Sequence, residues 1–187
     1  GRIELALGAG GFWDAIEAMG GRRLTAGESV GALAEAIDII RGIWDPADRS
    51  ALRVEGEFYR VAGAKRGPAP AHPVPIWLGA YKPRMVRLIG SKADGWLPSL
   101  GYMKPGELAA GNAVIDEAAT QSGRDPRDIR RLLNVGHLSA DEMIALAVED
   151  GIGTFILAGD DPAAMADFAA AIPEIRATVA AERGPDE

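Results

Sequence analysis

Short apolar runs alternate with amphipathic stretches along the whole of this 187-residue chain. The runs are bounded by glycine or proline and predict buried strands, whereas the stretches between them carry apolar residues three or four positions apart, as helices do. Five strand-helix units in a row favour the α/β class, with a parallel sheet or barrel. The strands are predicted near residues 3–8, 76–79, 95–98, 131–135 and 154–158.

Two of the predicted helices are long, and each has one apolar stripe. A single stripe indicates a helix that packs one face against a sheet. The stripe of the first helix, which ends near Asp45-Pro46, consists of Val30, Leu33, Ile37, Ile40 and Trp44. The stripe of the last helix consists of Met165, Phe168, Ile172, Ile175 and Val179.

Proline and capping residues predict where several helices begin. Proline fits the first position of a helix, where its missing N–H costs nothing, and this pattern predicts starts at Lys104-Pro105, Asp125-Pro126 and Asp161-Pro162. The segment 139–142, Ser-Ala-Asp-Glu, is a capping box.

Residues 52–61 alternate around Glu55-Gly56-Glu57 and predict a small inserted hairpin. Four prolines between positions 68 and 75 then predict a stiff, extended connector. We see no domain boundary within 1–187, so we expect one domain. Five strand-helix units fall short of the eight that close a barrel, and an open sheet of five would expose its edges.

The chain is acidic, with 27 Asp and Glu against 20 Lys and Arg and a net charge of −7. This charge argues against nucleic acid or an anionic membrane as the main partner. Cysteine is absent, which excludes disulfides and sulfur-ligated metal. No apolar run approaches the roughly 18 residues that span a bilayer, and no signal-peptide pattern is present. We therefore expect a cytoplasmic protein.

In barrels and in open α/β sheets, ligands bind at the carboxyl ends of the strands. Two of the loops that follow the predicted strands are dense in glycine, and three carry aromatic residues. Glycine lets the backbone approach a ligand and an aromatic side chain stacks on a flat ring, so these loops suit a phosphorylated planar cofactor. The five loops are 8–13, 79–82, 98–102, 136–138 and 159–161.

The segment 73–96 is the most informative of all. A buried strand leads through Gly79 into a helix that begins at Pro83, so the N–H groups of residues 80–82 and the helix dipole favour an anion there. Lys82 or Arg84 would add positive charge. The alternative is a tight strand-to-helix turn with two solvated cations, and the residues alone do not decide between the two.

The sequence gives weaker evidence for the other candidate ligand-binding residues. Gly8-x-Gly10 follows a strand, but Trp13 stands where a dinucleotide-binding loop needs its third glycine. Tyr81 either caps the barrel mouth or lies along a ligand ring. A lone histidine such as His137 is more often tolerated than catalytic, and the spacing of the sequence supports neither a metal site nor paired carboxylates.

Five segments, in fixed order, form a family pattern: GRIELALGAG, ESVGALAEAIDIIRGIWD, VEGEFYRV, PVPIWLGAYKPRMVRLIGSKADGWLP and GIGTFILAGDDPAAMADFAAAIPEIRATV. They resemble the bacterial luciferase-like flavin-dependent monooxygenase superfamily, including its deazaflavin-dependent oxidoreductases. The resemblance implies a (β/α)8 TIM-type barrel that binds FMN or the deazaflavin coenzyme F420, for hydride transfer or oxygen activation on a small organic substrate. It also implies that the first strand here is the fourth of the barrel, so that three strand-helix units are absent.

The resemblance assigns a role to the turn Gly79-Ala80-Tyr81-Lys82, which matches the family's phosphate-binding turn. More usual members carry a Gly-Gly-Ser-Gly type of turn before Pro-Arg-Met. Here Ala80, Tyr81 and Lys82 replace the small residues, which leaves backbone binding in place but reduces the space for a phosphate.

Other cofactor residues follow from the same resemblance. Ala9, beside Gly10, stands where luciferases place a phosphate-contacting arginine, so Lys82 or Arg84 would supply that charge. Trp96 matches a tryptophan in the barrel core near the cofactor. The resemblance carries no catalytic acid or base over to this chain.

The rival interpretation is a truncated, non-catalytic family member that acts as a structural or oligomeric binding module. Its open barrel edge would need a partner, most simply a second copy, so we expect a homo-oligomer.

Overall fold

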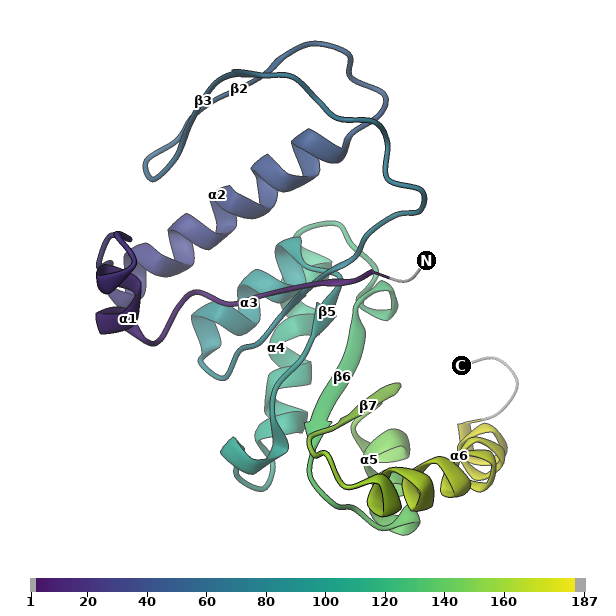
Figure 1. Ribbon diagram of the computed structural model, residues 1–187. Coiled ribbons are helices and arrows are strands. Elements are labelled where there is room, and N and C mark those ends of the chain that lie inside the picture. Colours follow the sequence, from purple (N-terminus) through teal and green to yellow (C-terminus); the bar gives the residue numbers. More distant parts are fainter. Residues whose placement is uncertain (1–2, 184–187) are drawn as a thin grey trace.

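A curled, five-stranded parallel sheet forms the centre of the computed structural model, which describes residues 3–183 (Figure 1). The strand order is β1-β4-β5-β6-β7, so that β1 and β7 are its two edges. The strands are β1 (Leu5–Leu7), β4 (Ile76–Leu78), β5 (Gly95–Trp96), β6 (Arg130–Val135) and β7 (Thr154–Leu157). The α/β class and the partial barrel predicted from the sequence are thereby confirmed.

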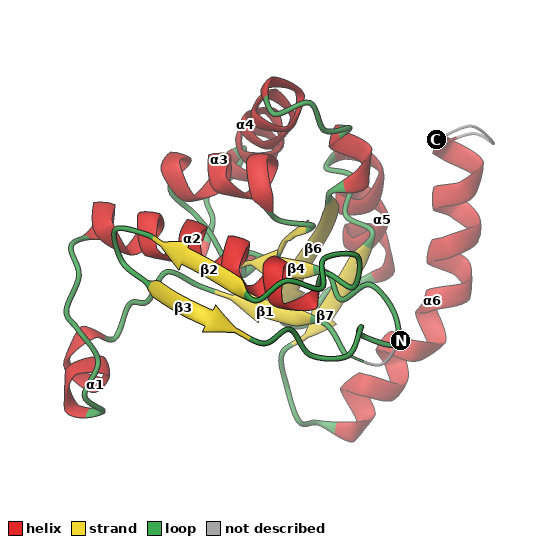
Figure 2. Ribbon diagram, turned by 90° about the horizontal axis from the view of Figure 1, so that it is seen from above, coloured by secondary structure: helices red, strands yellow, loops and turns green. Residues whose placement is uncertain are grey.

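Helices connect the strands and cover the outer side of the curled sheet (Figure 2). The short helix α1 (Trp13–Ala18) and the hairpin of β2 (Leu52–Glu55) and β3 (Arg60–Ala64) are added beyond β1. The remaining helices are α2 (Ala26–Trp44), α3 (Pro83–Lys92), α4 (Glu107–Gln121), α5 (Ala140–Glu149) and α6 (Pro162–Arg183).

The two faces of the sheet differ in burial. Side chains of the outer face lie beneath the helices, and Ile76, Leu78 and Leu133 are fully buried there. On the inner face a Cβ built on Gly95 would lie 2.6 Å from Cδ1 of Trp77, so only glycine fits that position. A closed barrel fills its interior with side chains from every strand. In this sheet the inner face stays partly open, and Ile156 is 37% exposed.

The hairpin is fastened to α2 by one carboxylate. Glu35 accepts hydrogen bonds from the backbone N–H groups of Glu57, Phe58 and Tyr59, at 2.8, 3.0 and 3.0 Å. Phe58 also fills the space over Gly31, where an added Cβ would lie 2.8 Å from its ring. The inserted hairpin predicted from the sequence is therefore confirmed, and it rests on α2.

The helix starts were predicted with mixed success. Pro83 and Pro162 begin α3 and α6, and the capping box at Ser139 is formed. The start at Lys104-Pro105 was wrong by two residues, because Gly106, with a φ of +82°, turns the chain in the left-handed region before α4 begins.

At Asp125-Pro126 the chain makes only a 3-10 turn, Pro126–Asp128, because β6 begins two residues later. Asp125 nevertheless caps that turn by accepting from the N–H of Arg127.

One helix was not predicted, and two further expectations needed correction. Helix α1 was not predicted, since its six residues are too few for a clear period. Strand β1 is three residues long, shorter than the predicted 3–8. The apolar stripe of α2 packs into the core as expected, but in α6 Met165 is 53% exposed, whereas Ile175 is buried.

Candidate active site

The carboxyl ends of β1, β4, β5 and β6 lie side by side and present the 79–82 turn at their middle (Figure 1). The sheet continues one residue beyond β4, because Gly79 N donates to the carbonyl of Leu7 at 3.2 Å. Beyond this point the chain leaves the sheet and enters α3 at Pro83. The turn is therefore held at its start by the sheet and at its end by a helix.

Trp96 holds the 79–82 turn from its buried side, which faces the helices. Its indole Nε1 donates to the carbonyl oxygen of Ala80 at 2.9 Å, and both residues are buried, with 1% and 3% of their surface exposed. The ring packs so closely on Gly111 of α4 that an added Cβ there would lie 2.2 Å from the ring. These contacts favour a supporting role for Trp96, on the helix side of the turn.

The front of the turn offers unused donors. In the described part of the chain, the backbone N–H groups of Ala80, Tyr81 and Lys82 have no hydrogen-bond partner, and the first helical bond of α3 is donated by Val86 to Lys82 O. These groups lie at the positive end of the α3 dipole. Such an arrangement binds anions.

Positive side chains flank these donors. Lys82 and Arg84 are exposed, and within 3–183 neither forms an ion pair. The guanidinium of Arg84 lies against the first turn of α2, since a Cβ built on Gly27 would be 2.9 Å from its Nη1. Lys82 itself carries one of the unused N–H groups, so its side chain branches directly from the turn.

Tyr81 connects the turn to the next two strand ends. Its hydroxyl oxygen accepts a hydrogen bond from the N–H of Ser99, at 3.0 Å, and its ring meets that of Tyr102 edge-on, with centroids 6.1 Å apart. Ser99 Oγ in turn accepts from Nδ2 of Asn134, at 3.3 Å. The sequence had placed Ser99 in the candidate loop 98–102 without giving it a role, and it missed Asn134, although an asparagine inside the apolar strand LLNV was a usable signal.

Ala9 and Gly10 lie at the neighbouring strand end, after β1. They line a cavity of about 560 Å³ between β1, α1, α2 and the hairpin, with Trp13 and Phe58 among its walls. Gly10 has a φ of +92°, which favours glycine. The 79–82 turn and Trp96 thus form one cluster, and Ala9 and Gly10 belong to the loop one strand away.

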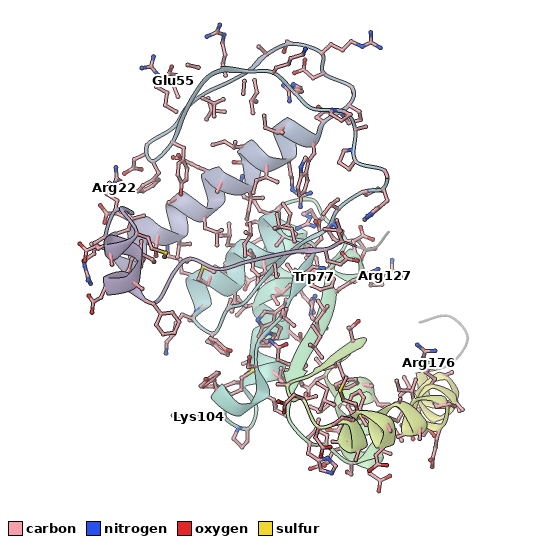
Figure 3. All side chains as sticks on the ribbon, in the orientation of Figure 1. Arg22, Glu55, Trp77, Lys104, Arg127 and Arg176 are labelled. Carbon is pink, nitrogen blue, oxygen red and sulfur yellow. The ribbon has the colours of Figure 1, made fainter. Side chains whose placement is uncertain are left out.

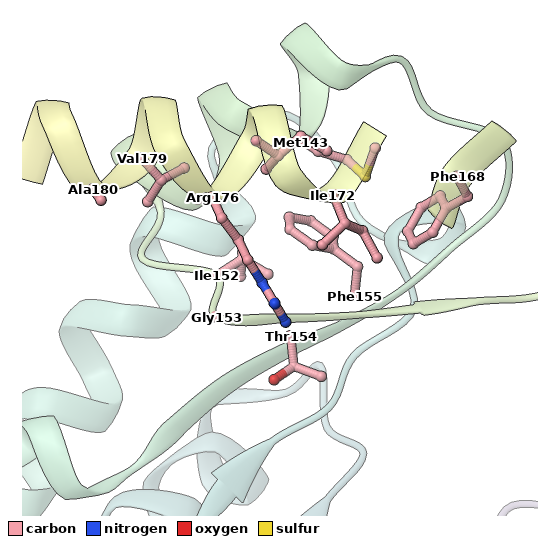
Figure 4. A pocket seen from close by; sticks show the side chains of 12 residues that line it. Met143, Ile152, Gly153, Thr154, Phe155, Phe168, Ile172, Arg176, Val179 and Ala180 are labelled. Atoms are coloured by element: carbon pink, nitrogen blue, oxygen red, sulfur yellow. The ribbon is translucent and has the colours of Figure 1, made fainter. Parts of the chain in front are cut away.

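A second cavity, of about 540 Å³, lies at the opposite edge of the sheet, between β7, α5 and α6 (Figure 4). Its walls are mainly apolar, and Arg176 reaches across it toward Thr154. Each free edge of the sheet is therefore bordered by an apolar cavity.

A buried polar atom also faces the inner side of the sheet. The indole Nε1 of Trp77, labelled in Figure 3, is buried and has no hydrogen-bond partner among the described residues. A buried donor of this kind normally finds a partner, so the inner face is a place where a further segment or a ligand would be stabilised.

The two histidines form no site with the 79–82 turn in the described part of the chain, and His137 interacts electrostatically with Glu142. His137 is exposed after the end of β6, and Nδ1 of His72 lies 2.7 Å from the carbonyl oxygen of Pro73. Over residues 3–183 the structure holds no group of three or more metal-ligating side chains. Within the same range, no helix has the length and apolar character needed to cross a membrane.

Residues 1–142 match the family model described as luciferase-like monooxygenase. The chain belongs to this luciferase-like family. The family resemblance predicted from the sequence is thereby confirmed.

The chain is similar to a dehydrogenase and a reductase. The F420-dependent glucose-6-phosphate dehydrogenase of Intrasporangium calvum is 30% identical over 139 residues, which are 72% of this chain and 40% of that protein. The 5,10-methylenetetrahydromethanopterin reductase of Archaeoglobus fulgidus is 30% identical over 166 residues, 87% of this chain and 46% of that protein. The chain spans less than half the length of these two relatives.

Solved structures share the luciferase-like fold. A long-chain alkane monooxygenase superposes with a TM-score of 0.73 and 14% identity, covering 87% of this chain and 59% of that one. An F420-dependent secondary alcohol dehydrogenase superposes with a TM-score of 0.65 and 19% identity, covering 79% and 44%. At these identities the likeness concerns the fold alone.

Proposed function

We propose that this chain is the phosphate-binding part of a luciferase-like oxidoreductase that uses coenzyme F420 for hydride transfer to or from a small organic substrate. The observation that carries the proposal is the open 79–82 turn, with three unused N–H groups and Lys82 at a helix N-terminus. The F420-dependence of relatives 30% identical to the chain supports the choice of cofactor.

The turn suits a phosphate ester because it combines unused N–H donors with two exposed cations at a helix N-terminus. The N–H groups of residues 80–82 would hold its oxygens, Lys82 would balance its charge, and Ala80 is kept in place by Trp96. Ala9 lacks the positive charge that the resemblance assigns to its position in luciferases, and Lys82 takes over that role. The bound cofactor would supply hydride chemistry at its ring.

We further propose that the sheet is five eighths of a (β/α)8 barrel in the functional protein. Three observations on residues 3–183 support this: β1 and β7 have no outer neighbour there, an apolar cavity borders each of these strands, and Trp77 Nε1 on the inner face has no partner. Three more strand-helix units would pair both edges and fill the interior. The catalytic residues then belong largely to those units, and none is assigned in this chain.

FMN is the second candidate cofactor, because the family model is that of luciferase-like monooxygenases. The same turn would hold its phosphate. A non-catalytic binding module stays the rival function, while a cytoplasmic location, a homo-oligomer and the lack of a nucleic-acid partner remain predictions.

Isothermal titration of the purified 187-residue chain with coenzyme F420 and with FMN tests the proposal. We expect saturable binding of both, tighter for F420. Binding of neither would refute the cofactor role. Native mass spectrometry of the same sample separates a monomer from an assembled module.

A further inference from the structure

Two tyrosines stand where the 79–82 turn meets the loop after β5. Tyr81 is 45% exposed and Tyr102 is 80% exposed, and their rings lie edge to face. An edge-to-face contact covers only one face of one ring, and the 80% exposure of Tyr102 leaves ring surface accessible to a ligand. Aromatic side chains are common in the lining of ligand sites, and these two stand beside the candidate anion-binding turn.

The position of Tyr102 depends on Tyr81. The 3-10 turn η1 (Leu100–Tyr102) follows Ser99 directly, and Tyr102 N donates to Ser99 O at 3.1 Å. Ser99 is itself held by the Tyr81 hydroxyl and by Asn134. Removing that hydroxyl would leave the N–H of Ser99 without its acceptor and loosen the segment that carries Tyr102.

We propose that Tyr102 contacts the planar ring system of the bound cofactor and that Tyr81 is the positioning residue which holds it there. The proposal rests on the proposed function, because it needs a ligand whose phosphate lies on the 79–82 turn. The proposal assigns the two parts of the ligand to different residues. The backbone N–H groups and Lys82 bind the phosphate, and the tyrosine pair binds the ring; we call this the division of labour.

Riboflavin and FMN separate these two contributions, because they share the ring and differ in the phosphate. Tyr81→Phe keeps the aromatic ring and removes one hydrogen bond, and we expect about fivefold weaker binding of both ligands. Tyr102→Ala should weaken both by about tenfold, since stacking on an aromatic side chain is lost. Lys82→Glu should weaken FMN alone.

Tyr59→Phe is the matched control, because Tyr59 is also 45% exposed but lies on the hairpin. Its affinities should equal those of the unmodified chain. Thermal unfolding of each variant shows whether it is folded. Tyr81→Ser removes the ring together with the hydroxyl and should weaken riboflavin and FMN binding at least as much as Tyr81→Phe.

The outcomes are distinct. If the unmodified chain binds FMN but Tyr81→Phe and Tyr102→Ala leave the riboflavin and FMN affinities unchanged, the tyrosine pair has no role in ring binding. If Tyr81→Phe weakens FMN alone, Tyr81 acts on the phosphate and the division of labour is wrong. If the unmodified chain binds neither FMN nor coenzyme F420, the proposed function itself fails.

Discussion

Replacing Trp96 by phenylalanine tests whether the 79–82 turn is held from behind by one buried hydrogen bond. The change removes the Nε1 donor and leaves the carbonyl of Ala80 unsatisfied, at a cost of about 1–3 kcal/mol. The smaller ring also leaves part of a fully buried site empty, which adds about 1–2 kcal/mol, less than a complete truncation to alanine. We expect a loss of about 3 kcal/mol in the free energy of unfolding.

Trp77→Phe is the matched control, because it makes the same chemical change where Nε1 has no partner among the described residues. Removing an unpaired buried donor costs no hydrogen bond, so we expect a change within about 1 kcal/mol. Urea denaturation followed by circular dichroism measures both variants. Equal losses in the two would refute the assignment of the Trp96 hydrogen bond as a principal support of the turn.

Three further predictions concern separate parts of the chain. Lys82→Glu should weaken FMN binding about tenfold by placing negative charge at the phosphate, whereas the exposed Lys65→Glu should not, as titration calorimetry would show. Gly111→Ala should destabilise the fold by about 2 kcal/mol in urea, because its Cβ overlaps the ring of Trp96; an unchanged midpoint would contradict the packing. Burial raises the pKa of Glu35, but the N–H groups of Phe58, Tyr59 and Glu57 lower it more, so its pKa lies below the ordinary value. The stability that Glu35 contributes is therefore present above the unfolded-state pKa and is lost as pH falls through the lowered folded-state pKa. Hydrogen exchange should show the amides of the hairpin losing protection in that pH range, and Glu35→Gln should abolish this pH dependence.

The fold could be predicted from the sequence because the residue patterns that mark its strands and helices are local. Strands β1, β4 and β7 are short and mainly apolar, and the stripe around Leu33 and Ile37 marks the buried face of α2. The start of a helix was harder to predict where a glycine after the proline turns the chain, as Gly106 does before α4. Helix α1 escaped prediction because six residues hardly exceed one and a half turns.

The site was only partly readable, because its contacts join residues far apart in the sequence. The 79–82 turn follows from glycine, proline and the helix dipole. The hydrogen bonds from Ser99 to Tyr81 and from Asn134 to Ser99 cross between loops and strands, and no spacing in the sequence encodes them. Trp96 was assigned near the cofactor from the resemblance, whereas its packing on Gly111 depends on the placement of α4.

The most direct test of the phosphate role is a ¹H–¹⁵N NMR titration of the ¹⁵N-labelled chain with coenzyme F420. The amide resonances of Ala80, Tyr81 and Lys82 should shift with the ligand, because their N–H groups are the proposed donors. The amides at the start of α5, a capped helix N-terminus outside the site, should stay in place. Binding that leaves the three turn amides unshifted would contradict the assignment of this turn as the phosphate site.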